Sequence, residues 1–211
     1  PGAMILTKIV YPETGEPETR DHIRISKRRT FANVFEAISN GASEGMKVAI
    51  NVTAMILALV ALVAFIDWIL GLGGMFCYNY IPGCSHLTFL SHLSLKLILG
   101  KIFAVFAIII GVPLHDASTV GALMGTKLVL NEMVAYVGLT HVAQTLDPKS
   151  FMLASFALCS FGNFGSIAIQ IGGIGELAPN QKKNLARLGL RALICGTLSC
   201  YLSAAIVGVL L

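Results

Sequence analysis

The chain has 211 residues, of which 55% are hydrophobic and only 12% are charged, and its mean hydropathy is +0.78. These values exclude an ordinary soluble domain and indicate an integral membrane protein. The formal net charge is +4, but the basic residues fall in a few clusters beside apolar runs. That arrangement is typical of membrane orientation and not of nucleic-acid binding.

Residues 1–10 are expected to form the end of a membrane helix that begins upstream. The chain opens without Met and without the organisation of a signal peptide, so we interpret it as part of a longer protein. Residues 11–47 are predicted to be a loop followed by an interfacial helix, and their basic residues place them on the cytoplasmic side. These basic residues are Arg20, Arg24, Lys27, Arg28, Arg29 and Lys47.

Residues 48–70 are predicted to form a scaffold helix that crosses the membrane. The run from Val48 to Ile66 carries no charge and is about long enough to cross a hydrocarbon core. Asn51 and Thr53, near its start, could contact a partner helix or could be ordinary interfacial polar residues.

Residues 71–92 are expected to form an external loop, because they contain several glycines and a proline but no Lys or Arg. Cys77 and Cys84 could form a disulfide there. Alternatively, the two cysteines could hold zinc together with His86 and His92, although their spacing matches no strong zinc pattern. Cysteines and histidines that are simply unpaired loop residues are the favoured interpretation.

Residues 93–113 are apolar but interrupted by Lys96 and Lys101, which favours an interfacial helix. Pro113 is expected to end it. His115 and Asp116 follow and could be taken for a catalytic pair, but a helix start with Asp116 as N-cap is the better interpretation.

Residues 114–147 are predicted to form a re-entrant hairpin with its tip near Leu130 to Glu132. Several glycines and polar residues interrupt this apolar stretch, and irregular backbone is tolerated at membrane depth only beside protein or a cavity. A carboxylate in such a place is a functional candidate, so Glu132 and its neighbour Asn131 stand out. Glu132 could instead simply pair with Lys127 or lie at a water interface.

Residues 148–176 are predicted to form a broken membrane helix. Residues 161–166, with the sequence Phe-Gly-Asn-Phe-Gly-Ser, place two glycines beside polar side chains in its middle. Such breaks build substrate and ion sites in many transporters, whereas the glycines could also merely allow close helix packing.

Residues 177–211 are predicted to form a cytoplasmic loop and the last membrane helix. The loop is placed by its basic residues, and the helix carries one face of small residues four positions apart. The small residues are Gly196, Cys200, Ala204 and Gly208. The complete fold class is therefore all-α, with spanning helices, a re-entrant hairpin and a broken helix.

Several of these stretches resemble the concentrative nucleoside transporter family in its bacterial form. Residues 45–55 resemble its scaffold helix, residues 127–136 its second hairpin tip, and residues 157–166 its broken binding-site helix. Residues 171–175, 178–179 and 186–192 continue the pattern, so the resemblance covers essentially the whole chain.

The resemblance implies a nucleoside importer, for example of uridine, that is coupled to sodium or protons and lies in a bacterial inner membrane. It implies a homotrimer with an elevator-like movement, of which this chain is the second inverted repeat. In this family Glu132, Asn163 and Ser166 are expected to bind the ribose, and Phe161 to pack against the nucleoside. Asn131 is included among the expected substrate-binding residues, and no enzymatic role or cofactor is expected.

The chain departs from the family pattern at four positions: Thr126, Met133, Ser160 and Gly162. The family's first hairpin, which reads the base, and most of its cation site are absent from these 211 residues. A transporter of nucleobases or another polar solute, or a non-transporting membrane subunit, therefore stay open as alternatives. A membrane hydrolase that uses His115, Asp116 or Glu132 lacks accompanying residues of the required spacing.

Overall fold

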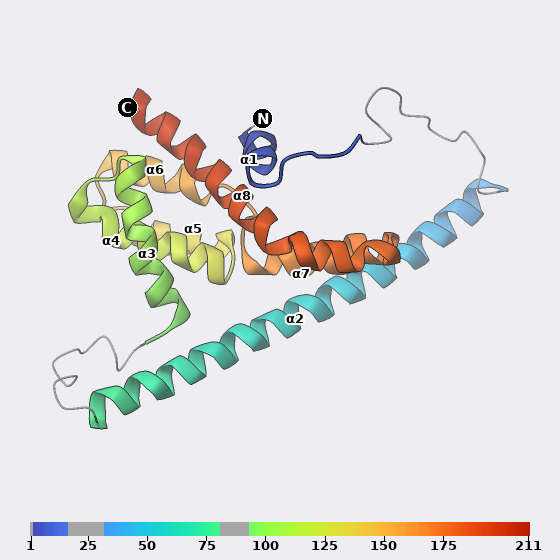
Figure 1. The fold of residues 1–211 in the computed structure, drawn as a ribbon, viewed down its shortest axis with the longest axis horizontal. Helices are drawn as coiled ribbons and strands as arrows, with labels where there is room; N and C mark the ends of the chain where they lie inside the picture. The colour runs from blue at the N-terminus through green and yellow to red at the C-terminus, as the bar shows by residue number, and fades with distance from the viewer. Residues whose placement is uncertain (1, 17–31, 81–92) are drawn as a thin grey trace.

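The computed structural model describes residues 2–16, 32–80 and 93–211, and every regular element in these ranges is helical (Figure 1). The elements are α1 (Gly2–Val10), α2 (Val34–Tyr80), α3 (Leu95–Ile110), α4 (Leu114–Val129), α5 (Glu132–Val142), α6 (Pro148–Leu158), α7 (Phe164–Leu177), a 3₁₀ turn η2 (Pro179–Gln181) and α8 (Lys182–Leu210). The all-α class predicted from the sequence is confirmed. Among the described residues, two stretches are long and apolar enough to cross a membrane, Val34–Tyr80 and Pro179–Leu210.

α2 is one continuous helix of 47 residues, about 70 Å long at 1.5 Å per residue. No helix end therefore separates the predicted interfacial helix, up to residue 47, from the predicted spanning helix that starts at residue 48. Which part of α2 lies at the membrane interface stays a prediction. Residues 71–80, expected in an external loop, are helical too, because no proline stops α2 and Gly71 and Gly73 do not end it. Its only buried residues are Val63 and Gly74, so most of its apolar surface faces away from the described part of the chain.

Some sequence predictions lie outside the described residues. The disulfide and zinc alternatives depend on Cys84, His86 and His92, which fall within 81–92, and the basic cluster from Arg20 to Arg29 falls within 17–31. Cys77 itself lies half-buried near the end of α2.

The core lies where α3, α4, α5, α6 and α8 pack together, at the left of Figure 1. Each of these five helices contributes buried residues to one apolar cluster. One such residue from each helix, in chain order, is Ala107, Met124, Leu139, Leu153 and Ala204. α3 and α4 approach closely because their contact is built from glycines: a Cβ atom on Gly121 would lie 2.4 Å from the backbone nitrogen of Ala104.

The chain reverses or breaks at two places that matter for the site. The turn between α4 and α5 comprises Leu130 and Asn131, within the stretch predicted for the hairpin tip. The break between α6 and α7 comprises residues 159–163, so the predicted interruption at 161–166 extends too far and its last three residues form the first turn of α7.

α7 packs along α2, and Figure 1 shows the two helices side by side. Asn51 of α2 donates from Nδ2 to Oε2 of Glu176 on α7 over 2.9 Å, so it does contact a partner helix. Thr53 instead donates to the carbonyl oxygen of Ala49 in its own helix, 2.8 Å away.

α8 begins at Lys182, so the predicted cytoplasmic loop from 177 onward is much shorter than expected. The basic residues of this region lie inside the helix, because charges mark a membrane side without ending a helix. They are Lys182, Lys183, Arg187 and Arg191. In the predicted small-residue face, Cys200 and Ala204 are buried, and Gly208 lies so close to the carbonyl oxygen of Ile110 that a Cβ atom would lie 2.6 Å from it.

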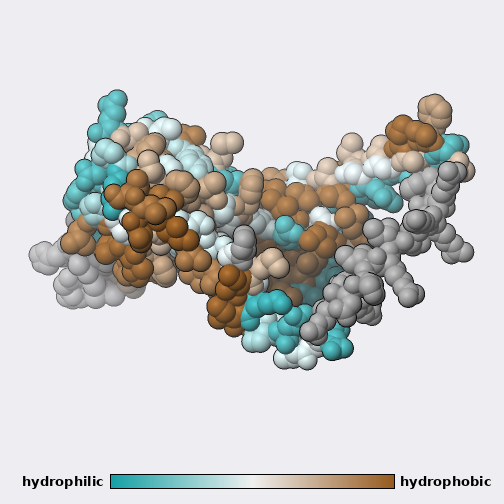
Figure 2. All heavy atoms as spheres, turned by 90° about the horizontal axis from the view of Figure 1, so that it is seen from above, coloured by the Kyte–Doolittle hydropathy of each residue, from teal (hydrophilic) through white to brown (hydrophobic). Residues whose placement is uncertain are grey.

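Apolar side chains cover much of the face drawn in Figure 2, mixed with smaller polar areas. The most apolar window of α2 has only 6% of its residues buried, against 33% for the window in the stretch that includes α8. A soluble protein buries apolar surfaces of this size. Helices that expose them face lipid or further protein.

Candidate functional site

Each of the two interruptions ends in an asparagine that caps the following helix. The Oδ1 atom of Asn131 accepts the backbone N–H of Val134 at 2.9 Å, at the start of α5. The Oδ1 atom of Asn163 accepts the backbone N–H of Ser166 at 2.8 Å, at the start of α7. Asparagine suits this position because its side chain satisfies a backbone donor that has no partner within the helix.

Glu132 and Asn163 join the hairpin tip to the helix break. Asn163 donates from Nδ2 to Oε2 of Glu132 over 3.0 Å, although the two residues are 31 positions apart. The hydroxyl of Ser166 lies 3.1 Å from Oδ1 of Asn163 and donates to the carbonyl oxygen of Phe161. A carboxylate, an amide and a hydroxyl therefore converge beside the first turns of α5 and α7, whose free N–H groups favour negative charge.

Phe161 stands in the break and is 78% exposed within this chain. Together with Gly162 and Ser166 it lines a cavity of about 1040 Å³ between α7 and α8. An exposed aromatic ring next to a few convergent polar groups is a common arrangement in small-molecule sites.

The structure thus brings four of the five predicted site residues together and gives the fifth, Asn131, a local role. Asn131 lies at the tip, next to Glu132 in sequence, but it is exposed and its oxygen caps α5. Contact of any of these side chains with a substrate stays a prediction.

Lys127 attaches the hairpin tip to the other side of the break. Its Nζ donates to the carbonyl oxygen of Ala157 over 3.0 Å and to Oγ of Ser160 over 2.7 Å. In the described ranges, no ion pair within 4.0 Å joins Lys127 to Glu132, so their predicted alternative pairing is wrong. A lysine in an apolar stretch was the available signal, but its partners lie 30 and 33 positions away, so they could not be named from the sequence.

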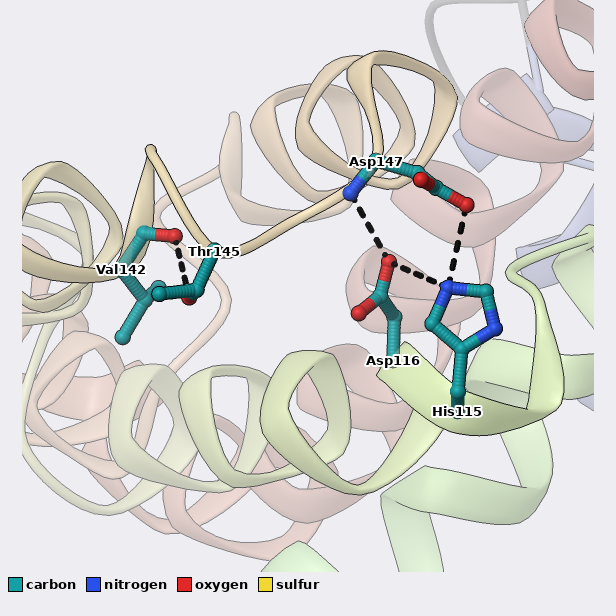
Figure 3. A network of polar contacts seen from close by, with 5 residues as sticks. All are labelled: His115, Asp116, Val142, Thr145 and Asp147. Atoms are coloured by element: carbon teal, nitrogen blue, oxygen red, sulfur yellow. Dashed lines mark hydrogen bonds and ion pairs between the residues drawn. The ribbon is translucent and has the colours of Figure 1, made fainter.

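A second polar cluster lies at the neck of the hairpin, where α4 starts and α6 starts (Figure 3). Nε2 of His115 lies 3.0 Å from Oδ2 of Asp147 and 3.5 Å from Oδ2 of Asp116. Asp116 also accepts the backbone N–H of Asp147 at 3.0 Å. The N-cap of α4 is Pro113, so the prediction of Asp116 as N-cap is wrong, and its carboxylate instead binds the start of α6.

Within the described residues, His115, Asp116 and Asp147 form the group whose ligand atoms, all within 4.8 Å, could hold a metal ion. Their polar atoms already bind one another, which fastens the neck without an ion. Glu132 lies at the other end of α4, about 24 Å along the helix axis. A catalytic site that combines Glu132 with the neck residues is therefore excluded.

Nearly the whole chain matches a single family model. The family model described as the C-terminus of Na⁺-dependent nucleoside transporters matches residues 1–208. The chain belongs to the concentrative nucleoside transporter family. It represents the C-terminal half of such a transporter, which is a membrane protein and not an enzyme.

Relatives and solved structures agree with this assignment. An uncharacterised transporter of Bacillus subtilis, YutK, is 42% identical over 99% of this chain and 49% of its own length. The nucleoside permease NupC of Helicobacter pylori is 37% identical over 99% of this chain and 48% of its own length. A structure of the transporter CNTnw in an intermediate state is 36% identical, covers 100% of this chain and 49% of its own, and has a TM-score of 0.76. The chain thus spans about half the length of these two curated relatives.

Proposed function

We propose that the intact parent protein is a cation-coupled nucleoside symporter and that this chain supplies the ribose-binding half of its site. The observation that carries the proposal is the hydrogen bond between Glu132 and Asn163, with Ser166 beside it. It unites the tip of one segment with the break of another, which is where secondary transporters place their substrates.

The chemistry of these side chains suits the neighbouring hydroxyl groups of a ribose. The Glu132 carboxylate has two oxygens, of which Asn163 occupies one, so it can accept hydrogen bonds from sugar hydroxyls. The amide of Asn163 can donate and accept, and the hydroxyl of Ser166 can turn toward a ligand. The exposed ring of Phe161 offers an apolar surface for the rest of the nucleoside.

The coupling ion is proposed to be sodium or a proton, with most of its site in the half of the parent that this chain lacks. The family match supports sodium by its description. The proposal places the parent in a bacterial inner membrane as a homotrimer with an elevator-like movement.

The deciding experiment is uptake of radiolabelled uridine by the full-length parent in proteoliposomes. We expect uptake under an inward sodium gradient or an inward proton gradient, and its loss in Glu132→Gln. Glu44→Gln is the matched control, because Glu44 is an exposed carboxylate on α2 outside the site. We expect this control to transport like the wild type.

A competition arm tests the ribose assignment. Unlabelled uridine should compete strongly, whereas 2′,3′-dideoxyuridine should compete poorly, because a site that pairs with hydroxyls leaves buried polar groups unpaired when they are missing. Equal competition by both compounds would contradict the proposal that these side chains bind the ribose. Absence of uptake under both gradients would contradict the proposal that the substrate is a nucleoside.

A further inference from the structure

Lys127 is a buried charged group that the proposed substrate contacts do not use. Its side chain is 1% exposed, and Asp116 is the other charged residue buried in the described part of the chain. A buried ammonium is costly unless its donors are satisfied and its charge is compensated. The environment of Lys127 therefore has to supply ligands for a cation.

The oxygen ligands come from the end of α6, and Sγ of Cys200 on α8 lies 3.8 Å from Nζ. Ala157 is one of the last residues of α6, whose final carbonyl groups have no N–H partner within the helix and carry partial negative charge. Its carbonyl oxygen and Oγ of Ser160 accept the hydrogen bonds of Lys127. The ring of Tyr201 lies 5.8 Å from the same nitrogen and adds its negative face.

The oxygen ligands at this place are of the type that hold a monovalent cation at the carboxyl end of a half-helix in other transporters. Here the chain provides the cation itself. Lys127 fastens the tip to the α6 side of the break, while Glu132 fastens it to Asn163 on the α7 side.

We propose that Lys127 is a positioning residue whose ammonium serves as a built-in monovalent cation at the end of α6. It holds the hairpin tip where Glu132 meets Asn163, and without it the substrate side chains are present but no longer aligned. The substrate readout of this inference rests on the proposed nucleoside function, whereas the placement of the tip does not.

The test uses the purified full-length parent in detergent, with uridine binding measured by calorimetry in sodium buffer. Lys127→Met keeps the length of the side chain and removes its charge. We expect its uridine affinity to fall about tenfold or more, because the loss of a hydrogen bond to a charged group changes a binding constant by about this factor. Lys183→Met is the control, because Lys183 is exposed at the start of α8, and it should bind uridine like the wild type.

Chemical rescue separates charge from packing. Lys127→Ala leaves space for n-propylammonium, which equals the missing part of the side chain. We expect this ion to restore uridine affinity at least in part, and n-propanol at the same concentration not to do so. Equal recovery with both compounds, or wild-type affinity in Lys127→Met, would overturn the proposal.

A measurement without substrate keeps the two proposals distinguishable. Hydrogen–deuterium exchange of residues 126–135 in the uridine-free protein should increase in Lys127→Met and stay unchanged in Lys183→Met. If the wild type binds no uridine, the proposed function fails, and the hydrogen–deuterium exchange alone tests whether Lys127 holds the hairpin tip in place. Unchanged exchange in Lys127→Met would then refute the role of Lys127.

Discussion

The starts of α5 and α7 contain the same local motif in two different environments. In each, an asparagine accepts the backbone N–H of the residue three positions on, at 2.9 Å for Asn131 and 2.8 Å for Asn163. Asn163 is 5% exposed, and its amide also donates to Glu132. Asn131 is exposed, and within the described ranges its amide nitrogen has no hydrogen-bond partner. The cap motif sets where a helix starts, whereas tertiary position determines which asparagine can hold the carboxylate.

The largest loss of transport is expected when Asn163 is replaced. Asn163→Ala removes the cap of α7 and the partner of Glu132 together, so uridine uptake by the full-length parent should fall about 100-fold, a ratio that corresponds to ~2.7 kcal/mol. Initial uptake rates in proteoliposomes measure it.

Asn163→Ser separates the two roles, because serine also caps helices well but cannot reach Glu132 with an amide. We expect this variant to match the wild type in thermal unfolding while its uptake stays low. Wild-type uptake in both variants would show that the contact with Glu132 is unimportant.

A smaller effect is expected at Asn131. Asn131→Ala removes one exposed cap bond, which costs about 1 kcal/mol, so uptake should fall less than in Asn163→Ala and the thermal transition should drop by a few degrees. Asn131→Ser keeps a capping oxygen and should recover most of both values. If the serine variant loses as much uptake as the alanine variant, the amide of Asn131 contacts the substrate, in line with its place among the predicted substrate-binding residues.

The fold was predictable where apolar runs, glycines and polar interruptions mark it. The hairpin turn and the helix break were located to within a few residues, and the all-α class was correct. Helix ends were not, since α2 continues through both ends of its predicted span and α8 starts at Lys182. A polar or basic residue is compatible with a helix interior, so charge shows the membrane side but not the last helical residue.

The site was predictable only in part. The resemblance named Glu132, Asn163 and Ser166, and the structure brings these side chains together. The hydrogen bond from Lys127 to Ala157 was not predicted. A sequence pattern relates residues that are close along the chain, whereas the long side chain of Lys127 reaches from the hairpin to another helix. Contacts 30 positions apart depend on how the helices pack, which no local pattern specifies.

The start of α6 is fixed in a different way. Its N-cap residue, Asp147, makes no side-chain cap bond, and the backbone N–H of Asp147 itself donates to the carboxylate of Asp116 on α4. Asp116 lies at the neck of the hairpin, outside the two long apolar helices. The neighbouring Ser150 hydroxyl, the N–H of Asp147 and His115 hold the pKa of the Asp116 carboxyl below its ordinary value, although burial opposes them.

The sign of the pH dependence follows from that lowered pKa. Asp116 stabilises the folded state above the ordinary carboxyl pKa of 3.8, and this contribution is lost as the pH falls through the lower pKa of the folded state. Asp116→Asn should therefore lower the thermal transition of the purified parent at pH 7, by a loss of about 1 to 2 kcal/mol. The gap from the wild type should narrow below about pH 4. Glu44→Gln, an exposed carboxylate on α2, should show no such gap. A constant gap from pH 7 to pH 3 would mean that the contact of Asp116 with the start of α6 does not depend on the charge of its carboxylate.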